Sequence, residues 1–338
     1  MSDETHPDPT PVTGVRYGSV TVRDEIHFTG GLRALRASDG WRLGPIIEQG
    51  RLGWLSRPLQ SAQLAPVTDH LGLMMIAGEE TSDPDSMLPA WTWTPFDRPG
   101  VPLRTADTWS MIATSARMES DTPYADLALS IASTVRAAGL QLRRASGEYH
   151  AQLLAALHDG KKPEQRFSNT RVAELHLAFH SVIAELASAR DYIATLAARR
   201  IEAPSKIDAL SRLADWVGKP ANSDAKSDPL VSRLLADSDP AGSDPWLFHI
   251  GEYRNFLLHR QPMGVQDSAY MLKLRETAFG HVPIFLLCLE IDSHPGDETR
   301  VEALTRFVGL HNELCRLGDF AAGFAAYRPK MLRFTASE

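Results

Sequence analysis

The chain has 338 residues, of which 43% are hydrophobic and 23% are charged. This composition is typical of a globular protein and excludes a collagen-like, disordered or disulfide-rich peptide class. The length predicts about two domains, each able to bury a core without disulfide bonds. Cys288 and Cys315 lack the spacing of a metal site, and we expect reduced core thiols in a cytoplasmic protein.

The formal net charge is −7, which for the chain as a whole argues against a nucleic-acid partner. The charge is unevenly distributed, however. Residues 1–110 contain 9 Lys and Arg against 14 Asp and Glu, a net −5, whereas residues 131–214 contain 12 against 8, a net +4. The second region is therefore suited to modest, salt-sensitive binding of a polyanion.

The N-terminal segment and the longest apolar run bear on targeting and membrane insertion. Residues 1–12 are acidic and Pro-rich, and we expect a flexible tail there rather than a targeting signal. The longest apolar run, residues 282–291, has about half of the roughly 20 residues that a membrane helix needs. We therefore expect no membrane span and a buried core segment at this run.

Residues 13–104 are predicted to form a small β-rich domain. Hydrophobic residues alternate with polar ones over 20–28, which is the period of a strand, and glycines at 30–31 and 39–40 predict turns. The apolar run 71–77 predicts a further strand. The strand period extends over most of the segment up to this run.

A Pro- and Asp-rich linker is predicted at the end of this domain, over residues 81–102. Trp91 and Trp93 alternate within it, as in one packed strand. Stacking of nucleotide bases is the alternative reading of these tryptophans.

Residues 105–330 are predicted to be mostly helical. Asp121 and Pro123 supply a cap and a first helical position, and Gly139 is expected to end that helix. One apolar stripe then persists from about 168 to 201, a length that indicates a helical bundle. The other helices are expected at about 149–160, 205–217, 229–236, 244–260 and 298–325. The predicted fold class is α+β, with a β-rich N-terminal domain followed by an all-α bundle.

The segment 243–262 carries the most informative pattern. Pro245 suits the first position of a helix, and Pro262 disfavours helical geometry beyond Gln261. Asn255 and His259 are four residues apart and share a helical face, with Arg254 beside it. A phosphate lying over that edge would meet all three residues. The helix dipole favours imidazolium in the last turn, where His259 can exchange protons near neutral pH.

The run Arg254-Asn255-Phe256-Leu257-Leu258-His259 resembles the signature of HEPN-domain proteins, an arginine and a polar residue followed by apolar residues and a histidine. The likeness covers about residues 165–325 and extends to the long helix around Glu185 and Arg190. It implies a metal-independent endoribonuclease without a cofactor. The products would be a 2′,3′-cyclic phosphate and a 5′-hydroxyl.

By residue, the resemblance implies Arg254 as phosphate ligand, His259 as proton-transfer residue and Asn255 as an orienting group. It also implies a homodimer with a composite cleft, RNA as partner, a regulatory protein partner, and a toxin–antitoxin or antiviral role. Further substrate contacts are expected from four residues of the same region: Arg190, His176, His180 and Arg260.

The spacing alone is weak evidence for this motif, because a histidine follows an arginine by five positions at three places, after Arg171, Arg254 and Arg306. Only Arg254 is followed by a suitable polar residue. Two alternatives stay open. One is a noncatalytic module of the same type that binds RNA or protein. The other is a metal-dependent hydrolase built on His176 and His180, although Leu177 stands where zinc hydrolases of this spacing carry glutamate.

Overall fold

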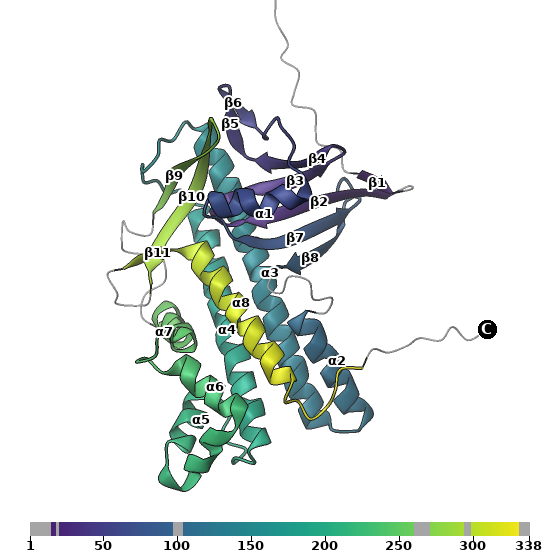
Figure 1. The fold of residues 1–338 in the computed structure, drawn as a ribbon, viewed down its shortest axis with the longest axis vertical. Coiled ribbons are helices and arrows are strands. Elements are labelled where there is room, and N and C mark those ends of the chain that lie inside the picture. The colour runs from purple at the N-terminus through teal and green to yellow at the C-terminus, as the bar shows by residue number, and fades with distance from the viewer. Residues whose placement is uncertain (1–14, 18–19, 97–103, 260–270, 294–298, 331–338) are drawn as a thin grey trace, which may run out of the picture.

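The computed structural model describes residues 15–17, 20–96, 104–259, 271–293 and 299–330 (Figure 1). It confirms the α+β class, since a β-rich N-terminal part is followed by a mainly helical C-terminal part. The tail expected at residues 1–12 lies outside the described residues.

The N-terminal part is built on an antiparallel sheet with the strand order β4-β3-β2-β7-β8, and β1 pairs with β2 beyond this path. A short hairpin of β5 and β6 and the helix α1 complete this part. The elements are β1 (Val15–Tyr17), β2 (Val20–Phe28), η1 (Thr29–Gly31), β3 (Arg33–Ala37), β4 (Gly40–Gly44), β5 (Ile46–Glu48), β6 (Arg51–Gly53), α1 (Ser61–His70), β7 (Met75–Ser82) and β8 (Ala90–Pro95).

Strand β2 confirms the predicted alternation, but both of its faces are covered. Ile26 and Phe28 lie in the hydrophobic core. Glu25 and His27, on the other face, are only 7% and 1% exposed. The polar face of β2 therefore packs against protein rather than water, and α3 provides the cover, since His27 contacts Ser146.

Helix α1 replaces part of the strand pattern expected up to residue 77. It begins with a capping box formed by the side chains of Gln60 and Gln63. Leu64, Val67 and Leu71 are buried at helical spacing. The strand predicted over 71–77 overlaps the observed one only in part, because β7 begins only at Met75.

Among the described residues, the helical part contains three helices of 20 residues or more and several shorter ones. Figure 1 shows α3, α4 and α8 running side by side, and these three helices contact one another. The elements are α2 (Thr105–Met118), α3 (Thr122–His158), α4 (Val172–Arg200), α5 (Leu210–Val217), η2 (Pro220–Ser227), α6 (Pro229–Ser238), α7 (Trp246–His259) and α8 (Ala303–Ala322).

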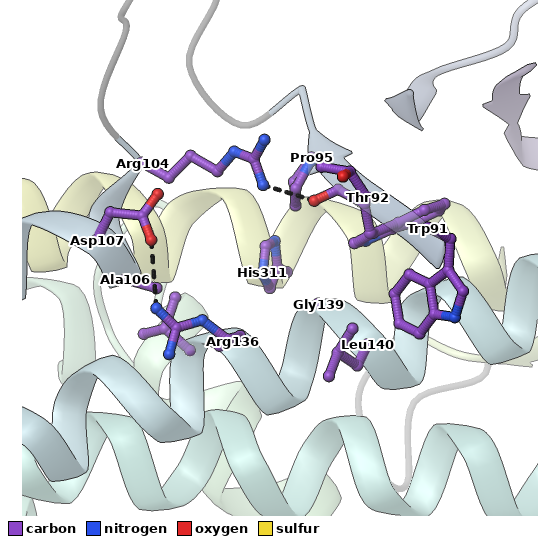
Figure 2. Close-up of a pocket in the computed structure, with 12 residues that line it drawn as sticks. Trp91, Thr92, Pro95, Arg104, Ala106, Asp107, Arg136, Gly139, Leu140 and His311 are labelled. Atoms are coloured by element: carbon purple, nitrogen blue, oxygen red, sulfur yellow. Dashed lines mark hydrogen bonds and ion pairs between the residues drawn. The ribbon is translucent and has the colours of Figure 1, made fainter. Parts of the chain in front are cut away.

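Helix α3 starts where the sequence predicts but does not end at Gly139. The Asp121 side chain accepts a hydrogen bond from the Tyr124 amide at 3.1 Å, which confirms the cap. The helix then continues for 37 residues, so two expected helices are one. Packing on α2, α4 and α8 outweighs the roughly 1 kcal/mol that a glycine costs inside a helix. Figure 2 shows Gly139 on the continuous helix, with His311 of α8 nearby.

The helical part also contains a small sheet, so it is not all-α. Residues 282–291 form a buried core segment, as predicted, but in β10 (Val282–Asp292). This strand pairs with β9 (Leu272–Phe279) and β11 (Arg300–Glu302). Gly280, whose φ is 60°, occupies the tight turn between β9 and β10 and adopts a conformation that favours glycine.

The buried hydrophobic residues of the two parts form one continuous core. At their junction Gly31, with φ 84°, lies so close to α3 that a Cβ atom would come within 2.8 Å of the Tyr149 carbonyl oxygen. Only glycine fits this approach. Within the described residues, no helix combines the length and apolar character needed to cross a bilayer.

Candidate functional site

Helix α7, which carries the arginine–histidine motif, is fixed in the bundle by a buried stripe. The stripe consists of Trp246, Leu247, Ile250, Tyr253 and Leu257. The Tyr253 hydroxyl also donates to the Asp292 carbonyl oxygen at 2.6 Å, which ties α7 to the end of β10. Because one face is anchored in this way, the opposite face has a defined orientation.

Asn255 lies on that opposite face and Arg254 lies at the border of the buried stripe, and both line a pocket of about 550 Å³ between α4, α5 and α7. Arg254 is half-buried and Asn255 is exposed. His259 is the last residue of α7, one helical turn beyond Asn255, as the motif predicts. Arg260 lies outside the described residues.

Arg190 of α4 lines the same pocket and joins three helices. Its Nε and Nη2 atoms donate to Asp191 Oδ1 at 3.1 and 3.0 Å, and Nη1 donates to the Leu247 carbonyl oxygen at 3.4 Å. Asp191 Oδ1 in turn accepts from the Leu210 amide at the start of α5. A Cβ atom on Gly251 would lie 2.8 Å from Arg190 Nη1, so the guanidinium can pack this closely against α7 only because residue 251 has no side chain.

The three arginines that line the pocket differ in their partners. Arg190 is paired with Asp191, and Arg212 is paired with Asp208 at 2.7 Å. Arg254 has no ion pair or hydrogen bond with any residue that the structure describes. A ligand phosphate can therefore meet the Arg254 guanidinium without displacing a carboxylate of the chain.

His176 and His180 do not line this pocket. They precede Arg190 on α4 by 14 and 10 residues, which corresponds to roughly 21 and 15 Å along the helix axis. Burial, and then the neighbouring His180, lower the pKa of His176 to about 4. Burial also lowers the pKa of His180. The pair is therefore a separate, mainly neutral feature of α4.

The same pair is the candidate for a metal site. In the described part of the chain, no group of three or more His, Cys, Asp or Glu residues is arranged to hold a metal ion. His176 and His180 thus lack a third ligand among these residues, and the geometry gives no support to the zinc-hydrolase alternative.

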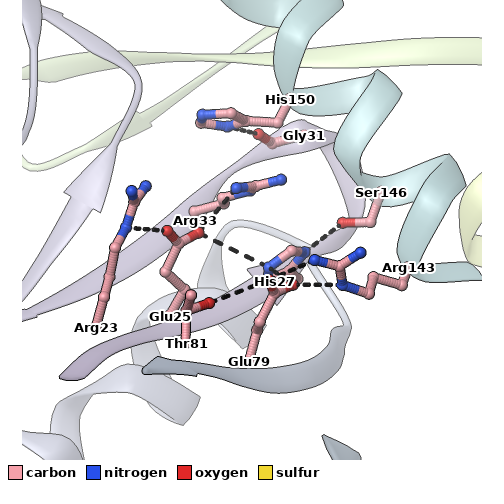
Figure 3. Close-up of polar contacts among 10 residues, drawn as sticks. All are labelled: Arg23, Glu25, His27, Gly31, Arg33, Glu79, Thr81, Arg143, Ser146 and His150. Atoms are coloured by element: carbon pink, nitrogen blue, oxygen red, sulfur yellow. Dashed lines mark hydrogen bonds and ion pairs between the residues drawn. The ribbon is translucent and has the colours of Figure 1, made fainter. Parts of the chain in front are cut away.

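A second constellation, which the sequence did not predict, lies between the N-terminal sheet and α3 (Figure 3). His27 Nδ1 lies 3.0 Å from Ser146 Oγ, and His27 Nε2 lies 3.4 Å from Glu79 Oε2. Arg143 binds Glu79 through two hydrogen bonds of 2.8 and 2.6 Å, and Arg33 binds Glu25 at 2.8 Å. In composition the group resembles a nucleophile–base–acid triad.

Burial excludes a catalytic role for this cluster. Ser146 and His27 are each 1% exposed, so no substrate carbon or phosphorus atom can reach the hydroxyl oxygen. Burial, followed by the charge of Arg33, holds the pKa of His27 well below its ordinary value. His27 Nε2 also makes no hydrogen bond with the described residues despite its distance to Glu79. The cluster is a buried polar network that fixes the sheet on α3.

Some pocket residues have no signal in the sequence motif. Phe248, Gly251 and Arg212 line the pocket because α4, α5 and α7 converge in space. Gly251 carries the one local signal, since a glycine inside a predicted helix indicates close approach by another group. Phe248 is 36% exposed and presents an aromatic surface beside the arginines.

No family model matches the chain, and no curated protein or solved structure matches it either.

Proposed function

We propose that the protein is a metal-independent endoribonuclease of the HEPN type, acting at the α7 pocket. The observation that carries the proposal is that Arg254 and Asn255 of the motif line one pocket with Arg190, while Arg254 has no acidic partner among the described residues. A buried or half-buried arginine without a carboxylate is suited to bind an anionic ligand. The basic region 131–214 supplies Arg190 and Arg212 to the same pocket.

The proposed chemistry assigns the phosphate to Arg254 and the proton transfers to His259. Arg254 holds the scissile phosphate and neutralises the charge that develops on its oxygens. His259 accepts the proton of the ribose 2′-OH while the 2′-oxygen attacks phosphorus and the bond to the 5′-oxygen breaks. His259 of the partner subunit gives a proton to the leaving 5′-oxygen. The exposed ring of Phe248 offers a surface on which a nucleobase stacks beside the phosphate.

This mechanism requires two copies of the chain, because each copy supplies one histidine. We therefore propose a homodimer in which two α7 helices face each other. A mixed dimer tests the composite site. A heterodimer of a wild-type chain and a His259→Ala chain retains only one of the two histidines, so its cleavage is expected to be as low as that of the His259→Ala homodimer, and sedimentation verifies the dimer.

The decisive experiment is cleavage of a labelled single-stranded RNA in EDTA, with analysis of the product ends. Wild type is expected to give cyclic-phosphate and 5′-hydroxyl ends. Arg254→Ala and His259→Ala are each expected to lower the rate of cleavage by at least about 100-fold. Arg117→Ala is the matched control, because Arg117 forms an exposed ion pair with Asp126 and does not line the pocket. Undiminished cleavage by both pocket variants would overturn the assignment.

A noncatalytic module is the second candidate, and the acidic groups of the pocket favour it. Asp191 and Asp208 neutralise two of its three arginines, and Glu252 lines the same pocket. Such a module would bind RNA without turnover. The same assay separates the two functions, since RNA retention on a filter without cyclic-phosphate ends identifies a binder.

A further inference from the structure

A second pocket, of about 350 Å³, lies where strand β8 meets the start of α2, the middle of α3 and α8 (Figure 2). Its apolar wall consists of Trp91, Trp93, Pro95, Val135 and Leu140. None of these residues belongs to the α7 pocket. The N-terminal sheet and the helical part each supply one side of the wall.

Gly139 of α3 keeps this pocket open. A Cβ atom there would lie 3.6 Å from His311 Nε2, 3.7 Å from Pro95 Cγ and 3.9 Å from Trp93 Nε1, all ordinary contacts. Packing alone would therefore accept alanine, which stabilises a helix interior by about 1 kcal/mol relative to glycine. A side chain larger than alanine would fill the space that the glycine leaves.

The pocket contains a donor without an acceptor. Trp93 is 6% exposed, and its Nε1 atom has no hydrogen-bond partner among the described residues. A buried N–H group without an acceptor is costly, which favours a ligand that brings one. Its Nε1 atom lies 3.9 Å from the position of a Cβ atom on Gly139, in the wall of the pocket.

The pocket also contains a positive charge that no carboxylate of the described residues balances. Arg104 donates to the Trp93 carbonyl oxygen at 2.5 Å and to Thr94 Oγ1 at 2.6 Å, both neutral acceptors. It forms no ion pair with a described carboxylate. The nearby Asp107 is instead paired with Arg136 at 3.2 Å.

We infer that this pocket binds a small aromatic anion. The indole rings of Trp91 and Trp93 pack against the ligand ring, the Trp93 N–H donates to a ligand acceptor, and Arg104 neutralises the anionic group. The volume suits one fused ring system, at the lower end of small-molecule sites. This inference is independent of the proposed ribonuclease.

The test uses 8-anilinonaphthalene-1-sulfonate as an aromatic anion and N-phenyl-1-naphthylamine as its neutral analogue, titrated by fluorescence into the full chain. Wild type is expected to bind the anion at one saturable site and the neutral analogue at least tenfold more weakly. Near-UV circular dichroism verifies native packing, because loosely packed states also bind such dyes.

Gly139→Leu is expected to weaken anion binding at least tenfold. Gly309→Leu is the matched control, since a Cβ atom on this α8 glycine would meet nothing within 4 Å. Should Gly139→Leu not fold, Trp93→Phe and Arg104→Gln replace it, each with an expected loss of about fivefold. Absence of saturable binding, unchanged binding in the pocket variants, or equal binding of the neutral analogue would overturn the inference.

Discussion

Arg143 and Arg254 project from helices of the same bundle, yet only Arg143 is neutralised by a carboxylate of the described residues. Arg143 on α3 binds Glu79 through two hydrogen bonds, within a network that also contains Glu25 and His27. Arg254 on α7 has no acidic partner among the described residues. A cation whose counter-charge is built into the chain stabilises the fold, whereas one without it is available for a ligand.

The largest expected effect is on RNA cleavage by Arg254→Ala. Loss of the group that neutralises the transition state is expected to lower the rate by about 10²–10³-fold. The melting temperature should stay within about 1 °C, because surface substitutions without partners change stability little. Single-turnover cleavage and thermal unfolding measure the two quantities. Arg254→Lys should recover only part of the rate, since lysine lacks the bidentate geometry. A large loss of stability in Arg254→Ala would remove the contrast with Arg143.

Arg143→Ala is expected to show the opposite behaviour. It leaves the Glu79 carboxylate, only 12% exposed, without its bidentate partner. The free energy of unfolding should fall by about 3 kcal/mol. Urea denaturation at pH 7 measures it, and RNA cleavage by the folded variant should be unchanged. Adding Glu79→Gln should recover part of the loss, because a neutral amide is less costly to bury. A loss below about 1 kcal/mol would show that the network carries little stability.

Gly251→Ala tests whether the position of Arg190 matters for cleavage at the α7 pocket. The new Cβ atom would lie 2.8 Å from Arg190 Nη1, so the guanidinium must move. Cleavage is expected to fall about 3–10-fold through misplacement of pocket groups. The gain of about 1 kcal/mol from the better helix former is expected to be offset, because the Arg190 guanidinium is moved from its place beside Asp191. Gly309→Ala is the control, with the full gain in stability and no change in cleavage. Equal cleavage by both variants would contradict a role for Arg190.

The smallest expected effect is a pH dependence of stability, which comes from His27, from His150 beside Gly31, and from His176 and His180 on α4. Burial is the main cause that lowers the pKa of His27 well below 6.5 and that of His150 to about 4. Below pH 6.5 the unfolded chain takes up protons that the folded chain refuses, so stability falls as the pH drops from 7 to 5. Urea midpoints across this range measure the slope. His150→Gln should flatten it, and Arg254→Ala should leave it unchanged. A stability that is flat over this range would contradict the burial of neutral histidines.

The sequence predicted those features that depend on local patterns. The Asp121 cap, the strand alternation over 20–28 and the apolar stripe of α4 were all confirmed. Local signals failed where packing competes with them. Gly139 does not end α3, because three neighbouring helices support the continuous helix. The capping side chains of α1 are glutamines, and Pro66 lies inside this helix, so its sequence lacks the usual helix signals.

The candidate site likewise contains features that the sequence could predict and features that it could not. The spacing of Arg254, Asn255 and His259 along one helix could be deduced, because helical geometry fixes it. The place of Arg190 against Gly251 depends on how α4 crosses α7, which no local pattern encodes. The polar positions of β2 were ambiguous for a related reason. Alternation shows that two faces differ, but a buried ionic network and a solvated face have the same period.

Helix α3 has one further consequence, for any attempt to divide the chain. At about 55 Å it is long enough to carry the sheet contacts of Arg143 and Ser146 and also the helical core around Ile131. A cut at residue 104 would separate the N-terminal strands from a helix whose surface they cover, and Tyr149 would lose the backbone of Gly31. The change in composition along the sequence is therefore not a boundary between two separable domains, because both parts pack on helix α3.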